Sequence, residues 1–322
     1  MRYRRLGASG VKVSAVGLGS WLTYGTAVEE ETARDCVRVA FESGVNFFDT
    51  ADVYAKGAAE EFLGRALSDF RREDLVVATK VFGAMSDGVN DRGLSRKHIM
   101  ESCAASLRRL RLETIDLYQC HRYDPEVSLP EVVRAMDDLI RQGKVLYWGV
   151  SEWSAEQIRA ACEVARDLRA PPPVSNQPLY NMLERGLEDE VLGACKELGV
   201  GQVVYSPLAQ GLLTGKYQGG RVPAGSRLAN DQTNRFMKRR VTAENLARVE
   251  RVLGIARELG VAPATLALAW CLRDENVASV ITGATQTAQV RENVAAADLE
   301  LSDEVLARID DALAADTEAV GP

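Results

Sequence analysis

An α/β fold of the (β/α)8 type, a TIM barrel, is predicted by three features of the sequence. Short apolar runs alternate with longer segments of helical periodicity, and eight such runs can be counted between residues 13 and 283. The runs are continuously apolar, as in parallel strands that are covered on both faces. The first strand-to-helix connection, "GLGSWLTYG" (17–25), lacks the G-x-G-x-x-G fingerprint of the rival architecture, a doubly wound open sheet. We therefore expect residues 1–322 to form a single barrel domain.

The first half of the chain predicts a hairpin and four strand–helix pairs. The stretch "YRRLGASGVKVS" (3–14) precedes the barrel and bends at Gly7 to Gly10, which suits a tight turn between two strands. Strands are expected at 13–19, 45–49, 75–80 and 115–121. Helices are expected at 28–44, 58–67, 96–110 and 129–143, with Gly44 ending the first of them.

The second half repeats the pattern and adds two helices to the eight that a barrel needs. Strands are expected at 145–151, 173–177, 201–206 and 277–283. Helices are expected at 154–168, 187–199, 243–259, 263–273, 287–297 and about 302–314. Ser154, with Gln157 three residues on, has the capping-box pattern of a helix start. The basic stretch "RFMKRR" (235–240) has no interleaved aromatic residues and is interpreted as a solvated loop.

Composition excludes several classes of protein. A formal charge of −7 is unlike that of a nucleic-acid binder. The six cysteines are scattered, without a C-x-x-C pair, so we expect them reduced and packed. The longest apolar run, "TLALAWCL" (265–272), is too short to cross a bilayer, and no charged-then-apolar leader opens the sequence. We expect a cytoplasmic protein that neither inserts into membranes nor binds nucleic acid.

Polar side chains stand at three consecutive strand ends. Asp49, Lys80 and His121 end the second, third and fourth strands, and Tyr54 lies in the loop after the second. Singly, each has an ordinary structural explanation, such as capping a turn or facing solvent. In a closed parallel barrel, however, these ends share the rim that carries the chemistry. His98, at the start of a helix, is expected to be exposed and has no role. No metal site is expected, because one histidine with one carboxylate is a poor ligand set.

An ammonium group beside a phenol suggests a proton donor. The cation favours the phenolate and lowers a pKa that starts near ~10, while a carboxylate keeps the ammonium group charged. An imidazole donates a hydrogen bond to a substrate oxygen. Such a group protonates an oxygen that is becoming an alkoxide, as in carbonyl reduction by a hydride-donating cofactor. The alternative from the same residues is an isomerase or lyase in which Lys80 forms a Schiff base.

Several ordered motifs make the chain resemble an aldo-keto reductase over essentially its whole length. They are "GLGSW" (17–21), "FFDTADVY" (47–54), "ATK" (78–80), "CHRYDP" (120–125), "WGVSEW" (148–153), "QPLYN" (177–181), "SPLAQGLLTGKY" (206–217) and "TGATQTAQVRENVAA" (282–296). Within that family the chain is similar to the branch that contains voltage-gated potassium channel β-subunits and bacterial reductases of small aldehydes. The 206–217 loop and "GKVLYWGVSEW" (143–153) carry this likeness.

The resemblance implies a catalytic tetrad of Asp49, Tyr54, Lys80 and His121. Tyr54 would be the general acid in NAD(P)H-dependent reduction of an aldehyde or ketone to an alcohol. Some relatives on the channel side carry Asn in place of this histidine, so His121 favours an active enzyme. The alternative is a dinucleotide-binding, redox-sensing subunit of a membrane channel or another protein, with slow turnover.

The resemblance also implies a nicotinamide dinucleotide, NADPH, bound across the rim without a Rossmann fold. Ser151 and Gln177 match positions that hold the carboxamide, and Tyr205 matches the aromatic residue that stacks on the nicotinamide ring. The full implied set is Ser20, Trp21, Asp49, Ser151, Gln177, Tyr205, Ser206, Leu208, Gln210, Lys216, Arg227, Gly283, Thr285, Gln289, Glu292 and Asn293. Two departures stand out. Glu152 replaces the Asn or Arg of many relatives, and Gly283 and Gln289 stand where many members place Lys or Arg.

The substrate pocket is expected to have apolar walls from Trp21 and Trp153, which suits aromatic or short aliphatic aldehydes. Its expected walls are Trp21, Tyr24, Tyr54, His121, Arg122 and Trp153. Members of this branch form tetramers or larger rings as well as monomers, so the resemblance is consistent with a homo-oligomer and with a monomer.

Overall fold

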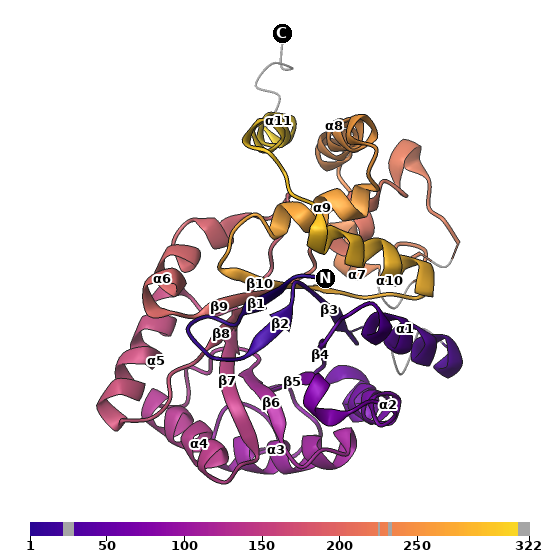
Figure 1. The fold of residues 1–322 in the computed structure, drawn as a ribbon. Coiled ribbons are helices and arrows are strands. Elements are labelled where there is room, and N and C mark those ends of the chain that lie inside the picture. Colours follow the sequence, from indigo (N-terminus) through magenta and orange to yellow (C-terminus); the bar gives the residue numbers. More distant parts are fainter. Residues whose placement is uncertain (22–28, 225, 231–233, 315–322) are drawn as a thin grey trace.

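Eight parallel strands close into a barrel in the computed structural model, which describes residues 1–21, 29–224, 226–230 and 234–314 (Figure 1). Around the barrel the order is β10-β3-β4-β5-β6-β7-β8-β9, so that β10 closes on β3 through the pair Val280 and Val16. The barrel strands are β3 (Val16–Gly19), β4 (Phe47–Asp49), β5 (Val76–Val81), β6 (Ile115–Cys120), β7 (Val145–Ser151), β8 (Ser175–Gln177), β9 (Gly201–Tyr205) and β10 (Val277–Thr282). The predicted fold class is confirmed.

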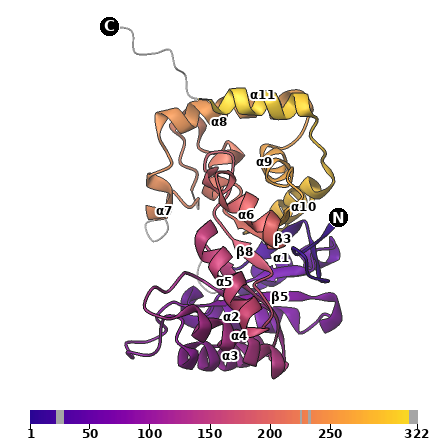
Figure 2. The same ribbon diagram turned by 90° about the vertical axis from the view of Figure 1, so that its left-hand side faces the viewer.

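Helices form a layer around the outside of the barrel (Figure 1). They are α1 (Glu30–Glu42), α2 (Ala58–Leu67), α3 (Arg96–Leu110), α4 (Leu129–Arg141), α5 (Ala155–Leu168), α6 (Val191–Leu198), α7 (Arg235–Lys238), α8 (Ala243–Leu259), α9 (Pro263–Cys271), α10 (Thr287–Val294) and α11 (Asp303–Leu313). Both members of the capping box at Ser154 and Gln157 are present. Helices α8 and α11 lie beside one another outside the ring of helices (Figures 1 and 2).

The N-terminal hairpin, β1 (Tyr3–Arg5) and β2 (Lys12–Ser14), packs against the end of the barrel at which the strands begin. Leu6 and Val13 are fully buried and belong to the same cluster as the barrel residues Phe47 and Leu117. The turn after β1 fits tightly, because a Cβ on Gly7 would lie 2.2 Å from the carbonyl oxygen of Gly199. In Figure 2 the N-terminus and α7 lie on opposite sides of the molecule. Because the hairpin covers the end at which the barrel strands begin, a binding site is expected at the opposite end, where the strands finish.

Two expectations from the sequence are wrong in detail. The predicted strand at 13–19 is divided between β2, which pairs antiparallel with β1, and β3, which begins the barrel. Residues 235–238 of the predicted solvated loop form α7 instead, and Met237 there is fully buried.

His98 is buried, with 2% of its surface exposed, rather than exposed as predicted. It lies in the first turn of α3, on the same buried helix face as Ser102 and Ser106, one and two turns along. Its Nδ1 lies 3.7 Å from Asp91, and its Nε2 has no hydrogen-bond partner in the described part of the chain.

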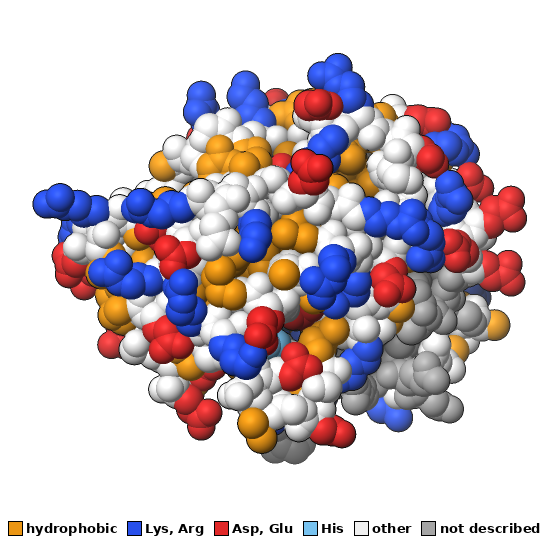
Figure 3. All heavy atoms as spheres, turned by 90° about the horizontal axis from the view of Figure 1, so that it is seen from below, with side chains coloured by type: hydrophobic (Ala, Val, Ile, Leu, Met, Phe, Trp, Pro, Cys, Tyr) orange, Lys and Arg blue, Asp and Glu red, His pale blue; other side chains and the backbone are white. Residues whose placement is uncertain are grey.

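The described surface carries charges of both signs, and the cysteines are unpaired. On the face shown in Figure 3, Lys and Arg side chains are interspersed with Asp and Glu, with small hydrophobic areas between them. All six cysteines are free thiols, and five of them are buried. Among the described residues no single helix has the length and apolar composition to cross a membrane. Helices α8 and α9 pass that test only when taken as a pair, and the chain bends by 101° between them.

Candidate active site

Four of the predicted residues meet at the C-terminal mouth of the barrel. Asp49 and Lys80 lie at the ends of β4 and β5, His121 directly follows β6, and Tyr54 begins a short 3-10 turn (Tyr54–Gly57). Lys80 Nζ lies 2.7 Å from Asp49 Oδ2 and 3.4 Å from the Tyr54 hydroxyl. The rings of Tyr54 and His121 meet edge to face, with centroids 5.8 Å apart.

Burial divides these four residues into an inner pair and an outer pair. Asp49 and Lys80 are 3% and 0% exposed, whereas Tyr54 and His121 are only half-buried. Lys80 uses its three donor positions on Asp49, on the Thr50 carbonyl oxygen at 2.7 Å and on the Tyr54 hydroxyl. The phenol and the imidazole are therefore the groups that an incoming molecule can reach, and the ion pair lies behind them.

Two amides complete the surroundings of Asp49. Gln177 donates from Nε2 to Asp49 Oδ1 at 2.9 Å, and Gln119 Nε2 lies 3.5 Å from the same oxygen. Gln177 is the residue predicted to hold a carboxamide, whereas Gln119 is not among the predicted site residues. The strand period of two places Gln119 on the same face of β6 as His121, which is the signal that would have found it.

Electrostatics at the site hold both outer groups in defined protonation states. Burial raises the pKa of the Tyr54 phenol, and the Lys80 ammonium group opposes but does not reverse that rise. The predicted net lowering of this pKa is therefore wrong, because desolvation outweighs the neighbouring charge. Burial also lowers the pKa of His121 to about 2, helped by the Lys80 and Arg122 cations. At neutral pH the phenol keeps its proton and the imidazole is uncharged.

Lys80 remains an ammonium group despite its burial. Desolvation alone would lower its pKa, but the Asp49 carboxylate and then Tyr54 raise it. An isolated buried ammonium would lose its proton, so Asp49 maintains the charge.

The loop that carries Tyr54 is anchored from both sides. Ala55 and Lys56 have left-handed backbone angles, with φ of 48° and 54°, which bend the chain sharply behind the phenol. Lys56 Nζ donates to the Ala84 carbonyl oxygen at 2.7 Å. Asp52 is fully buried and accepts a 2.8 Å hydrogen bond from Ser102 of α3. These anchoring residues are not among those predicted from the sequence.

Strained backbone gathers at the same end of the barrel. Eight non-glycine residues in the described chain have positive φ, and two of them end helices. The other six follow the ends of barrel strands, namely Ala55, Lys56, Glu152, Ser206, Ala209 and Gln210. Such conformations cost free energy and cluster where a ligand is held.

The predicted pyrophosphate loop follows β9 and presents cations. Ser206, Gln210 and Arg227 are linked in a chain of hydrogen bonds, and the Arg227 guanidinium lies over the Trp21 ring, 5.8 Å from its centroid. Lys216 is solvent-accessible and has no carboxylate partner in the described part of the chain. Desolvation by the surrounding loop, and then Arg227, lower the pKa of its ammonium group. Burial and mutual repulsion disfavour the positive charges of these two neighbouring side chains, and a bound anion would compensate them.

The predicted adenine and carboxamide residues lie around the rest of the rim. Gln289 Oε1 accepts from the Thr285 backbone N–H at 2.8 Å, before the start of α10. Ser151 donates to the Gln177 carbonyl oxygen at 2.8 Å, and Arg122 lies 3.4 Å from the Ser151 hydroxyl. The remaining predicted positions differ in exposure: Ser20 and Asn293 are buried, Tyr205 and Leu208 are half-buried, and Gly283 and Glu292 are exposed.

Trp153 is not displayed at the mouth as a pocket wall. It is 2% exposed and packs edge to face against Tyr123, with ring centroids 4.9 Å apart. The cause is Glu152, whose φ of 59° breaks the strand alternation after Ser151 and whose carboxylate accepts from the Leu179 N–H. Of the other expected walls, Arg122 is exposed and Trp21 half-buried, and Tyr24 lies outside the described residues.

Similarity to known proteins agrees with this geometry. The model of the aldo/keto reductase family matches residues 15–314. The chain is 44% identical over 302 residues to a probable voltage-gated potassium channel subunit beta of Arabidopsis thaliana, covering 93% of this chain and 92% of that protein. It is 45% identical, with the same coverage, to a protein of the same description from Oryza sativa subsp. japonica. It is 43% identical over 321 residues to a putative voltage-gated potassium channel subunit beta of Schizosaccharomyces pombe, covering 97% of this chain and 93% of that protein.

The closed parallel barrel carries its cluster of ionisable side chains at the C-terminal mouth, the end at which such barrels place their chemistry. The chain belongs to the aldo/keto reductase family.

Proposed function

We propose that this protein reduces aldehydes or ketones to alcohols with NADPH and that Tyr54 is the proton donor. The observation that carries the proposal is the position of Lys80 Nζ, between Asp49 Oδ2 at 2.7 Å and the Tyr54 hydroxyl at 3.4 Å. Family membership supports the reaction class, and the accessible cations of the 206–227 segment fit a dinucleotide phosphate.

NADPH, when bound, supplies the hydride that reaches the carbonyl carbon. The protein's own residues then control the oxygen. The neutral His121 imidazole donates a hydrogen bond that orients the carbonyl, and Tyr54 delivers a proton to the oxygen as negative charge develops there. Lys80, kept charged by Asp49, stabilises the tyrosinate that remains. The raised pKa of Tyr54 serves this step, because the donor must be protonated before it acts.

The replacement Tyr54→Phe tests the proposal directly. Because general acid catalysis contributes roughly 10²- to 10⁴-fold, we expect kcat for an aromatic aldehyde such as nitrobenzaldehyde to fall by about that factor. NADPH affinity, measured by fluorescence titration, should stay nearly unchanged. Tyr3→Phe is a matched control, since it removes a phenol hydroxyl at the opposite end of the barrel, where it donates to the Gly44 carbonyl oxygen. Wild-type kcat in the Tyr54 variant would reject Tyr54 as the acid.

The cofactor preference is a separate proposal. Lys216 and Arg227 near the proposed pyrophosphate loop fit the pyrophosphate that both cofactors share. Thr285 and Gln289 at the start of α10, where the 2′-phosphate would lie, support NADPH over NADH. We expect NADPH to bind at least about tenfold more tightly. Equal dissociation constants for the two cofactors would reject this preference.

The similar proteins suggest one alternative, because they carry the description of potassium channel β subunits. In that case the chain would bind the dinucleotide as a redox-sensing subunit and turn over slowly. Steady-state oxidation of NADPH with a panel of small aldehydes separates the two functions. Purification with tightly bound cofactor and no measurable turnover would favour the subunit.

A further inference from the structure

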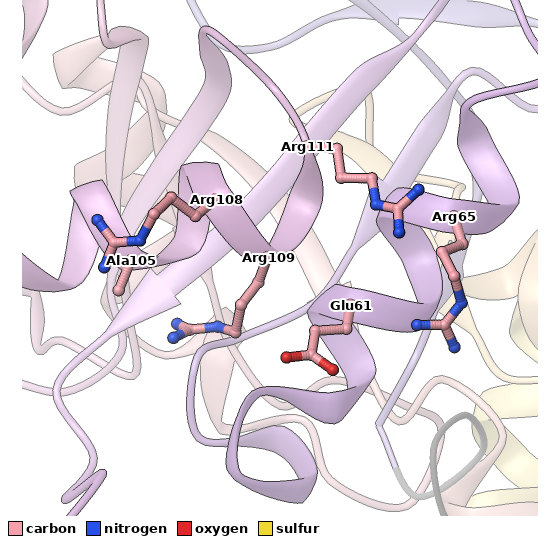
Figure 4. Close-up of a pocket in the computed structure, with 6 residues that line it drawn as sticks. All are labelled: Glu61, Arg65, Ala105, Arg108, Arg109 and Arg111. Carbon is pink, nitrogen blue, oxygen red and sulfur yellow. The ribbon is translucent and has the colours of Figure 1, made fainter.

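A charged cavity lies between α2 and α3, outside the barrel strands. Its volume is about 390 Å³, which falls in the range of small-molecule sites. The residues that line it are Glu61, Arg65, Ala105, Arg108, Arg109 and Arg111. In Figure 4, Arg65 and Arg111 lie on one side of Glu61, and Arg108 and Arg109 lie on the other. Four guanidinium groups and one carboxylate thus line this cavity, in a chain whose net charge is −7.

Two of these arginines have carboxylate partners, and one of them, Arg109, is fixed by a buried carboxylate. Arg109 Nε donates to Glu60 at 2.6 Å, and Glu60 is fully buried, with its other oxygen accepting from Thr79 at 2.6 Å. Arg65 pairs with Glu30 at 3.1 Å. Because the Glu60 carboxylate is inaccessible, it holds the Arg109 side chain in place without competing for a ligand in the cavity.

The other two arginines have no such partner. Neither Arg108 nor Arg111 makes a side-chain hydrogen bond or ion pair within the residues that the structure describes, and both are exposed. Glu61 likewise makes no ion pair there, although it lies among the four arginines. The cavity thus combines one guanidinium group held in place by a buried carboxylate, that of Arg109, with two that remain available to a ligand.

Close packing of the two helices brings the arginines together. A Cβ on Gly64 of α2 would lie 2.5 Å from the Leu110 carbonyl oxygen, so only glycine allows the end of α3 to approach this closely. Directly after that contact Arg111 takes a left-handed conformation, with φ of 56°, at the end of α3.

We propose that this cavity binds a small anion that carries two or more phosphate groups. Guanidinium groups match phosphate oxygens in paired hydrogen bonds, and arginine is favoured for this over lysine. Several guanidinium groups on two sides of one cavity suit a chain of phosphates better than a single one. The site is separate from the proposed cofactor loop, which follows β9.

Helix α5 provides a matched control for the ordinary alternative, in which arginines merely stabilise a helix end. Arg166 and Arg169 end α5 as Arg108 and Arg111 end α3. Each pair has one arginine in the last turn and one at a left-handed end residue, and all four are exposed. The α5 pair lies outside the cavity. The double replacements Arg108→Gln with Arg111→Gln, and Arg166→Gln with Arg169→Gln, therefore change the net charge and the helix ends alike.

The test is calorimetric titration of the full-length protein with inorganic tripolyphosphate at near-physiological salt and without added NADPH, whose own phosphates belong to the proposed ligand class. We expect one equivalent to bind, the α3 double variant to bind about tenfold more weakly or worse, and the α5 double variant to bind like wild type. Glu61→Gln removes the only carboxylate of the cavity and should strengthen binding. Lys216→Gln, in the cofactor loop, should leave this binding unchanged.

Three results would overturn the proposal: no binding to the wild type, an equal loss in the α3 and α5 variants, or orthophosphate binding as tightly as tripolyphosphate. Thermal unfolding of each variant checks that it is folded. If the α3 double variant does not fold, Glu61→Gln still tests the proposal, because it should bind tripolyphosphate more tightly than wild type and a loss of affinity would contradict this.

Discussion

Asp52 offers a sharp test of how burial and charge are balanced behind the active site. Its carboxylate is fully buried and receives hydrogen bonds from Ser102 at 2.8 Å and from the Val53 N–H at 2.6 Å. Desolvation is the larger effect and raises the pKa of Asp52 to about 7 from an ordinary value of 3.8. The perturbation is Asp52→Asn, which keeps the shape and removes the charge.

The magnitude follows from the difference in proton binding between the folded and unfolded states. Between pH 3.8 and about pH 7 the folded state keeps a proton on Asp52 that the unfolded chain releases. The contribution of this proton to the free energy of unfolding is therefore fully present below about pH 4 and is lost as the pH rises towards 7. With pKa values of 3.8 and about 7, the free energy of unfolding falls by roughly 2.5 kcal/mol between pH 5 and pH 8. The asparagine side chain of the variant has no proton to lose, so Asp52→Asn should escape this loss.

The assay is denaturant unfolding of wild type and variant across this pH range. The stability advantage of Asp52→Asn should grow by roughly 2.5 kcal/mol from pH 5 to pH 8, since all other titrating groups cancel in the comparison. Asp189→Asn, at an exposed position, is the control and should show no such trend. An advantage that is constant with pH would show that Asp52 is already ionised in the folded protein and would refute the reasoning.

Three further replacements test other parts of the structure. Gly64→Ala should destabilise the protein by about 1–3 kcal/mol in denaturant unfolding, because its Cβ would meet the Leu110 carbonyl oxygen at 2.5 Å; a neutral effect would mean that α2 and α3 separate easily. Arg72→Ala leaves the buried Asp116 without its 2.7 Å partner and should cost about 2–4 kcal/mol, whereas unchanged stability would mean that water replaces the pair. His121→Ala should lower kcat/KM for aldehydes about 10²-fold in an NADPH oxidation assay, and wild-type activity would remove it from the mechanism.

Much of the fold was predictable because apolar strand segments and amphipathic helical segments alternate regularly along the sequence. Helices at 58–67, 96–110 and 243–259 begin and end where periodicity places them, and strand 145–151 has its predicted bounds. The convergence of Asp49, Lys80 and His121 followed from topology alone, because parallel strand ends share one rim.

What the sequence did not reveal depends on local backbone geometry and on burial. Strand alternation would carry Trp153 to the same side as Ser151, but the left-handed Glu152 between them turns the indole into the core. His98 was misjudged because its helix face is buried through Ser102 and Ser106, whose small polar side chains hide the usual apolar pattern. The direction of the Tyr54 pKa needed the depth of burial, which charge pairing alone cannot give.

The buried Lys80–Asp49 pair is better understood as a positioning device than as a source of stability. Desolvation of two charges offsets most of their attraction, so such pairs contribute little to folding even at 2.7 Å. What the pair does provide is a fixed ammonium group with its three donor positions assigned, one of them to the Tyr54 hydroxyl. Replacing both charges by apolar groups would therefore be expected to preserve the barrel and abolish its chemistry. Replacing Asp49 alone would leave an uncompensated buried cation and lower the pKa of Lys80. Both the stability of the barrel and its catalytic activity would therefore decrease.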